Sequence, residues 1–173
     1  MFSRHLAACL TLMLTMTAAR AMTLASPDIR DGAAIAKTYI YTRCGGGNAS
    51  PALSWSAAPK GTRSFAVTVI DLSVKPSAWS HWIVVNLPAG TTSLARGVSA
   101  LPAGAQMVQS NFGEARYDGP CPPEGSGVHR YQFKVLALRS AAPSLAPDEH
   151  ASSVMSKLRD AALDSASIVA VYG

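Results

Sequence analysis

The stretch HRYQFKVLAL, residues 129–138, decides the fold because its side chains alternate in the way of a half-buried β-strand. One face of such a strand carries His129, Tyr131, Phe133 and Val135. The opposite face begins with Arg130, Gln132 and Lys134, which favour contact with water. The stretch therefore predicts a β-strand that carries an imidazole and a phenol on one face, near its beginning.

Three further stretches read as strands: SFAVTVI (64–70), HWIVVNL (81–87) and SIVAVY (167–172). In the second, alternation places His81, Ile83, Val85 and Leu87 on one face. Glycine- and proline-rich turns separate the strands along the chain. Regular strands with few helices predict a mainly β, antiparallel sandwich-like architecture.

One helix is expected near the C-terminus, over residues 147–163. Pro147 suits a first helical turn, and Asp148 and Glu149 suit the positive end of the helix dipole. Val154 and Leu158 follow at helical spacing and predict the buried side of this helix.

Length and composition indicate one globular domain. The chain has 173 residues, of which 49% are hydrophobic and 14% charged, and its formal net charge is +5. This is too apolar for a disordered chain. Lysine and arginine do not run together with aromatic residues, so we expect no nucleic-acid partner.

The N-terminus has the three-part pattern of a secretory signal peptide. Arg4 opens it, residues 6–16 form an apolar run, and Ala19-Arg20-Ala21 matches a cleavage site. We expect residues 1–21 to be removed, which leaves 22–173 as a single periplasmic or secreted domain. An uncleaved anchor is the alternative, but the apolar run is shorter than the about 20 residues that span a bilayer. We expect no transmembrane anchor in the mature protein.

Two cysteines, Cys44 and Cys121, lie outside this signal segment. An oxidising compartment would allow them to form one disulfide, and two free thiols are the alternative. Neither cysteine has the spacing of a redox or zinc motif.

Several polar residues lie at predicted strand ends and could hold an anion. Asp71 follows one strand, His81 begins another, and His129 and Tyr131 share a face of a third. Imidazole and phenol groups donate hydrogen bonds to phosphate or carboxylate oxygens. Taken singly, each of these residues is more often structural: a packed histidine, a core tyrosine or a strand-end turn acid.

Four blocks resemble the phosphatidylethanolamine-binding protein family (PEBP), in its bacterial, Raf-kinase-inhibitor-like branch. They are NASPALSW (48–55), SFAVTVID (64–71), HWIVVNLP (81–88) and GPCPPEGSGVHRYQF (119–133). The blocks occur in the order of the family and extend the resemblance from about residue 25 to the end. The resemblance implies a β-sandwich-like fold with a large central sheet and one or two short helices near the C-terminus.

The resemblance also implies a shallow pocket for phosphate or phospholipid headgroups. Matched residue by residue, the ligand-binding set is Asp71, Trp79, His81, Gly119, Cys121, Pro122, Pro123, His129 and Tyr131. Exported bacterial members carry cysteines at positions like Cys44 and Cys121, which supports a disulfide between them. No cofactor or metal is implied, and the oligomeric state is left open.

One loop departs from the family pattern. It reads DLSVKP (71–76) where the family has an Asp-Pro-Asp-x-Pro motif, so Leu72 and Ser73 replace a proline and a second acid. Ser80 stands where bacterial relatives carry an aromatic residue. The less negative loop leads to the hypothesis that Lys75 favours anions.

A non-enzymatic binding protein is the function expected, in which Asp71 orients an imidazole, His81 in the first instance. Some family members modulate proteases or kinases, so a secreted protease inhibitor or protein-interaction module is the alternative. A hydrolase would need Ser73 or Ser80 in a triad with Asp71 and His81, and the chain has no G-x-S-x-G motif. Two histidines and one acid could bind zinc, but no H-x-H spacing supports a metal site.

Overall fold

The computed structural model describes residues 21–141, 145–146 and 149–173. The predicted signal segment, apart from Ala21, lies outside the described residues, as do Pro147 and Asp148. Within the described part, no helix is long and apolar enough to cross a membrane.

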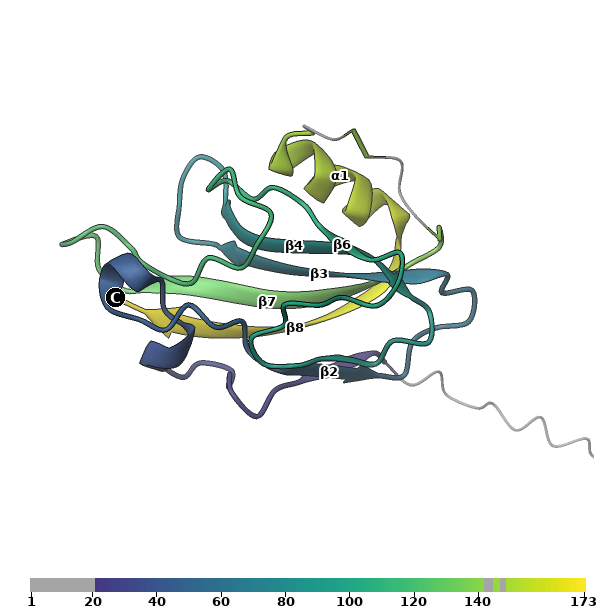
Figure 1. Cartoon of the computed structure of the whole chain (residues 1–173), viewed down its shortest axis with the longest axis horizontal. Coiled ribbons are helices and arrows are strands. Elements are labelled where there is room, and N and C mark those ends of the chain that lie inside the picture. Colours follow the sequence, from purple (N-terminus) through teal and green to yellow (C-terminus); the bar gives the residue numbers. More distant parts are fainter. Residues whose placement is uncertain (1–20, 142–144, 147–148) are drawn as a thin grey trace, which may run out of the picture.

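The molecule is built on a five-stranded antiparallel sheet, which confirms the mainly β prediction (Figure 1). Its strands, in spatial order, are β6 (Gln106–Met107), β4 (Trp79–Pro88), β3 (Ser64–Asp71), β7 (His129–Leu138) and β8 (Ala162–Tyr172). The strand β7 pairs with β8 along its full length and with β3 from Tyr131 to Leu138. It therefore lies in the interior of the sheet, with neighbours on both sides.

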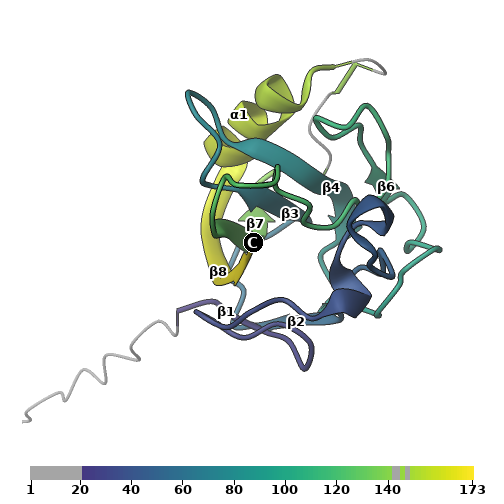
Figure 2. The same ribbon diagram turned by 90° about the vertical axis from the view of Figure 1, so that its left-hand side faces the viewer.

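A smaller antiparallel sheet covers one face of the large sheet, and a single helix covers the other (Figures 1 and 2). The small sheet contains β1 (Thr23–Ala25), β2 (Leu53–Ser56) and β5 (Ser93–Leu94), and the helix is α1 (Ala151–Ala161). Two 3-10 turns, η1 (Lys37–Tyr39) and η2 (Thr42–Cys44), follow β1. The result is the predicted sandwich of two sheets, with one C-terminal helix.

The two faces of the large sheet bury separate hydrophobic clusters. Between the sheets, Val67 and Val69 of β3 and Phe133 of β7 pack with Trp55 of β2. Under the helix, Ile83 of β4 packs with Val154 and Leu158, the two residues that predicted the buried side of the helix. The alternation expected in β3 and β7 is confirmed because both strands keep one register throughout.

The alternation expected in residues 81–87 was wrong. Ile83 and Val85 face the helix, whereas Leu87 packs between the sheets. Asn86 between them has φ = 59°, and the pairing with β3 shifts between Phe65 and Val67. This β-bulge adds a residue to β4, and the side chains beyond it change face.

The predicted helix and final strand had the wrong boundary between them. The helix ends at Ala161, and the last strand begins at Ala162, five residues earlier than the expected strand over 167–172. Ala162 is already extended, with φ = −69° and ψ = 133°, and it pairs with Leu138 of β7. Pairing with the end of β7 thus ends the helix at Ala161. The helical pattern of the sequence alone had extended it to Leu163.

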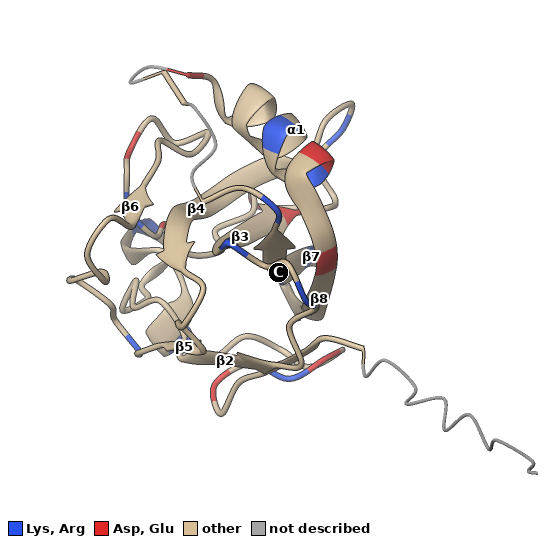
Figure 3. Cartoon of the chain, turned by 90° about the vertical axis from the view of Figure 1, so that its right-hand side faces the viewer, with Lys and Arg blue, Asp and Glu red and all other residues tan. Residues whose placement is uncertain are grey.

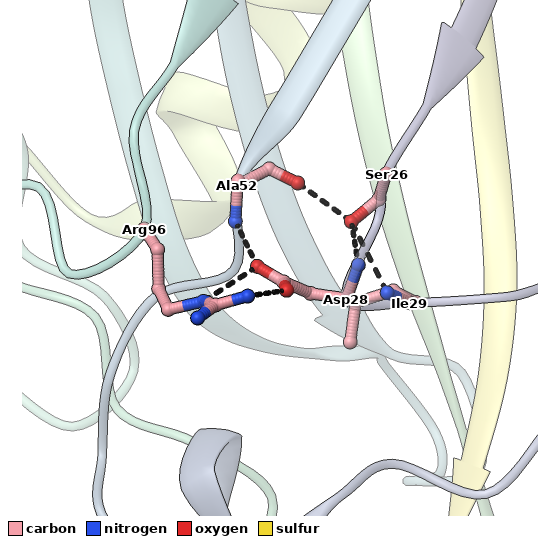
Figure 4. A network of polar contacts seen from close by, with 5 residues as sticks. All are labelled: Ser26, Asp28, Ile29, Ala52 and Arg96. Atoms are coloured by element: carbon pink, nitrogen blue, oxygen red, sulfur yellow. Dashed lines mark hydrogen bonds and ion pairs between the residues drawn. The ribbon is translucent and has the colours of Figure 1, made fainter.

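A polar network ties the small sheet to the loop after β5 (Figure 4). The Asp28 carboxylate accepts hydrogen bonds from the Ala52 backbone N–H at 2.7 Å and from Arg96 Nε at 3.1 Å, and it forms a second contact with Arg96 Nη2. Ser26 Oγ donates to the Ala52 carbonyl at 2.6 Å. The Asp28 side chain is only 1% exposed, so this network fixes three loops through a buried charge.

Figure 3 views the molecule from the end opposite the C-terminal end of β8. In this view the basic and acidic positions of the described residues are scattered over α1, the strands and the loops.

Candidate functional site

Three strands of the large sheet bring the predicted polar residues together at one end. Asp71 ends β3, Trp79 begins β4 and His129 begins β7. The register places Asp71 opposite Trp79 on one side and opposite Tyr131 on the other. Directly paired residues point to the same face of a sheet, so these three side chains converge. This is the end at which β8 and the chain terminate (Figure 2).

A second β-bulge in β4 directs His81 to the same place. The pairing passes from Val69 with Trp82 to Ile70 with Ser80, so His81 is the extra residue. Its ring packs edge-on against Tyr131, with the ring centroids 5.3 Å apart, while Trp82 packs in the core against Tyr117. Bulges often redirect a side chain in this way at functional sites. His81 and Trp82, although consecutive, therefore both contact rings on the side of the sheet that faces the small sheet.

A cavity of about 280 Å³ lies between these residues. It is lined by Asp71, Val74, Trp79, His81, Phe112, Cys121, Pro122, Pro123, His129 and Tyr131. All the predicted ligand-binding residues except Gly119 thus line a single cavity. Its walls are mostly apolar, with one carboxyl, two imidazoles and one phenol among them, a composition typical of small-ligand sites.

Gly119 lies behind the cavity and does not line it. Its backbone N–H donates to Asn48 Oδ1 at 2.8 Å, so it is not free for a ligand. A Cβ atom at this position would lie 2.2 Å from the Tyr39 carbonyl oxygen. Gly119 is thus the one predicted residue outside the lining, and a glycine is needed there for close packing of two backbones.

Asp71 is the centre of the polar wall. Its Oδ2 lies 2.6 Å from His129 Nδ1, and its Oδ1 accepts from the Ser73 backbone N–H at 2.8 Å. Both side chains of the Asp71–His129 pair are almost fully buried. The expectation that Asp71 orients His81 was wrong: the strand register places Asp71 beside the start of β7, so its partner is His129.

His81 is oriented by a backbone group instead. Its Nδ1 lies 2.7 Å from the Asp118 carbonyl oxygen, and the Asp118 N–H donates to the His81 carbonyl at 3.1 Å. Burial lowers the pKa of the His81 imidazole, although the nearby carbonyls and the Asp71 charge partly oppose this shift. The ring is therefore held in one orientation, and burial favours its neutral form.

Tyr131 stands between the two imidazoles. Its ring centroid is 5.3 Å from that of His81 and 6.4 Å from that of His129. Burial raises the pKa of the Tyr131 phenol, and the charge of Asp71 and a hydrogen bond to it raise the pKa further. The phenol therefore stays protonated at neutral pH and can act as a hydrogen-bond donor.

A disulfide joins Cys44 of η2 to Cys121 in the cavity wall, as predicted from the resemblance. The two residues are 77 positions apart in sequence, and their Cα atoms are 5.7 Å apart. Two further hollows, of about 540 and 610 Å³, lie beside the cavity and share Pro122 and Pro123 with it. The disulfide thus holds the proline loop in place along one side of the cavity.

Two residues at the site were not found from sequence. Phe112 lines the cavity and packs against His81, with ring centroids 5.1 Å apart, and Asp118 orients the His81 ring. Both belong to the long loop between β6 and β7, which has no strand or helix periodicity. The only local signal was an isolated aromatic residue in a polar loop and an acid directly before the GPCPP block.

The serines drawn in the hydrolase alternative do not reach a histidine. Ser73 Oγ accepts from the Arg130 backbone N–H at 3.0 Å, and the hydroxyl of Ser80 donates to Asn111 Oδ1 at 2.7 Å. Lys75 is exposed and does not line the cavity. The described part of the chain brings no three His, Cys, Asp or Glu residues together as a metal site.

Comparison with known proteins places this chain and its fold in one family. The family model described as phosphatidylethanolamine-binding protein matches residues 25–173. The chain is 43% identical to the UPF0098 protein YbcL of Escherichia coli over 130 residues, which are 70% of this chain and 71% of YbcL. It is also 43% identical to E. coli YbhB over 124 residues, 68% of this chain and 78% of YbhB.

The crystal structure of E. coli YbcL, described as a member of the mammalian PEBP family, has the same fold. It superposes with a TM-score of 0.84 at 37% sequence identity, covering 88% of this chain and 98% of that one. The chain therefore belongs to the phosphatidylethanolamine-binding protein family.

Proposed function

We propose that the chain is an exported, non-enzymatic binding protein that holds a small oxyanion, of the phosphate or phospholipid-headgroup type, in the cavity at the end of the large sheet. The contact that carries this proposal is the one between Asp71 Oδ2 and His129 Nδ1, at 2.6 Å. It orients the ring, and the described residues give its other nitrogen, Nε2, no hydrogen-bond partner.

The chemistry of the lining supports an oxyanion. Tyr131 supplies a phenol, and His129 supplies an imidazole that a buried carboxylate orients. Hydrogen bonds to an anion are charge-assisted and about twice as strong as neutral ones. Trp79, Phe112 and the two prolines surround these groups with apolar surface, which lowers the local dielectric and strengthens each contact.

A non-enzymatic role is supported by the hydroxyl groups near the site. Ser73 and Ser80 are engaged with Arg130 and Asn111, and neither forms a hydrogen bond with an imidazole. A serine nucleophile needs a base within hydrogen-bond reach. Export is supported by the signal-peptide pattern in the sequence and by the Cys44–Cys121 disulfide, because such bonds persist in oxidising compartments.

Chemical-shift mapping of the backbone amides at low salt, with inorganic phosphate and with phosphoethanolamine, tests this function. We expect shifts that saturate and that centre on His81, Cys121 and His129. The variant Asp71→Asn should weaken the response, and the matched control Asp160→Asn, on the exposed side of α1, should not. Shifts that are absent from the cavity, or equal in both variants, would contradict the proposal.

Modulation of a protein partner is the second candidate, and one observation favours it. Two large apolar side chains are exposed at the cavity end: Trp79, with 38% of its surface accessible, and Val128, with 61%. Exposed apolar groups around a polar cavity are typical of contact surfaces. A pull-down from periplasmic extract, with the Val128→Ser variant as control, tests this candidate. Recovery of one partner by the native chain and not by the variant supports it, and equal recovery contradicts it.

A further inference from the structure

The charged and polar side chains that line the cavity are an unusual set for an anion site. Among the described residues, its lining includes no lysine or arginine, and its one carboxylate is Asp71. Asp118, whose side chain is fully buried, lies near His81, but its carboxylate is paired with Arg116 Nε at 3.0 Å. Within the lining, His81 therefore shares the cavity with one acid, the Tyr131 phenol and the His129 imidazole. No permanent positive charge in the wall balances an incoming anion.

His81 presents a hydrogen-bond acceptor to this cavity. A backbone carbonyl can only accept, so the 2.7 Å contact with Asp118 requires a proton on His81 Nδ1. In a neutral imidazole the other nitrogen then has a lone pair and no proton. Burial favours this neutral form, and Nε2 is the ring nitrogen left for a ligand.

A ligand that has only acceptor atoms fits this wall poorly. Its oxygens would meet the lone pair of His81 Nε2 and the charge of Asp71, while the proton of the Tyr131 phenol is already directed to Asp71. A ligand that also carries a proton satisfies His81 as well. Sites built to pair with a ligand's own donor reject analogues that lack it, because a buried polar group is then left unpaired.

Resting on the proposed function, we propose that the site selects ligands that bring a proton donor beside their anionic oxygen, and that His81 Nε2 accepts that proton. A phosphate monoester in its singly charged form, with one P–O–H group, has this chemistry. A sulfate ester has the same tetrahedral shape and single charge but no proton to donate.

Methyl phosphate and methyl sulfate form the matched pair that tests the proposal. Calorimetric titration of the mature chain at pH 6 should show methyl phosphate binding at least about tenfold more tightly than methyl sulfate, since phosphomonoesters are about half singly charged near this pH. Equal affinities would overturn the proposal and leave the binding function intact. If neither compound binds, the proposed function itself fails.

Two variants assign the selectivity to His81. His81→Gln replaces the fixed acceptor by an amide that can present either a donor or an acceptor, so the preference for methyl phosphate should fall to less than about threefold. His129→Gln should weaken both compounds and keep their ratio. A ratio that changes in the second variant and not in the first would overturn the assignment.

A measurement on the native chain covers the case in which His81→Gln does not fold. Long-range ¹H–¹⁵N spectra of the histidine side chains at pH 6 report which ring nitrogen carries a proton. We expect the His81 Nε2 signal to be unprotonated in the free protein and to move on addition of methyl phosphate. A protonated Nε2 in the free protein would overturn the proposal.

The ligand's proton donor could come from a phosphate monoester or from the ammonium of a headgroup, and a second pair of compounds separates these two sources. Phosphoethanolamine has both a P–O–H group and an ammonium, whereas glycerophosphoethanolamine, a diester like a lipid headgroup, has the ammonium without the P–O–H. Tighter binding of phosphoethanolamine assigns the donor to a monoester. Equal binding of the two, with methyl sulfate still rejected, assigns it to the ammonium of a headgroup.

Discussion

Asp71 and Asp28 are both buried carboxylates with a basic partner, yet they have different roles. Asp28 has its oxygens filled by fixed donors, the Ala52 N–H and the Arg96 guanidinium, in a network that joins loops around the small sheet. Asp71 holds His129, whose second nitrogen is left for the cavity. The difference shows that a buried charge alone does not mark a site. A site needs hydrogen-bonding capacity that the fold leaves unused beside a cavity.

Removing the disulfide should have the largest effect, because both the stability of the fold and the phosphate affinity of the cavity depend on it. Replacing Cys44 and Cys121 together by serine reopens a loop of 77 residues and should lower the free energy of unfolding by about 2–4 kcal/mol. Because Cys121 lines the cavity, phosphate affinity should fall as well. Urea unfolding and calorimetry on the same samples check both. A variant that unfolds at the native urea midpoint would contradict this structural role.

Asp28→Ala should lower the stability of the fold and leave phosphate affinity unchanged. It leaves the Ala52 N–H and the Arg96 guanidinium without their acceptor, and the free energy of unfolding should fall by about 2 kcal/mol, since Arg96 can turn to water. Phosphate affinity at a temperature where the variant stays folded should match the native value. A loss of affinity without a loss of stability would reverse the roles assigned to the two carboxylates.

Low pH should remove the contribution that the Asp28 network makes to stability. Hydrogen bonds from Arg96 lower the pKa of Asp28 to about 2. Its contribution to stability is therefore complete above the ordinary carboxyl pKa of about 3.9 and is lost as the pH falls towards 2. Unfolding curves of native protein and Asp28→Asn should converge over this window. A constant difference between them from pH 5 to pH 2 would contradict the assignment.

Asp71→Asn should have the opposite pattern of effects: a loss of phosphate affinity with little change in stability. The amide keeps the shape of the carboxyl but removes the charge that orients the His129 ring, so phosphate affinity should fall about tenfold. The unfolding midpoint should change less than in Asp28→Ala. Calorimetric titration with phosphate provides the measurement, and unchanged affinity would show that Asp71 is only a turn residue at the end of β3.

Lys75→Ala should give the smallest effect. The side chain is exposed outside the cavity lining, so it acts only through the general field that attracts anions. We expect a loss of phosphate affinity below about twofold at low salt, which disappears at 0.15 M salt because the Debye length is then about 8 Å. A larger loss that persists in salt would place Lys75 in direct contact with the anion.

Much of the fold could be predicted from local periodicity. The strands β3 and β7 keep one register along their length, so alternation alone identified their buried faces. Alternation failed in β4, because bulges at His81 and near Asn86 shift its pairing with β3. Such shifts are set by the neighbouring strand and the positive φ of Asn86, which no pattern of hydrophobic residues records.

The candidate site shows the same division. The resemblance to the family supplied the residues at strand ends, and all but Gly119 line the cavity. The predicted partner of Asp71 was wrong because the partner depends on which strand lies beside the end of β3. Phe112 and Asp118 were missed because the loop that carries them has no period and acquires its shape from contacts with His81.

A crystal structure of the mature chain soaked with phosphate is the decisive test of the proposed site. We expect phosphate in the cavity, with its oxygens about 2.6–3.2 Å from Nε2 of both His81 and His129 and with none bound at Asp28. Phosphate bound elsewhere on the surface, with the cavity between the two imidazoles holding only water, would contradict it.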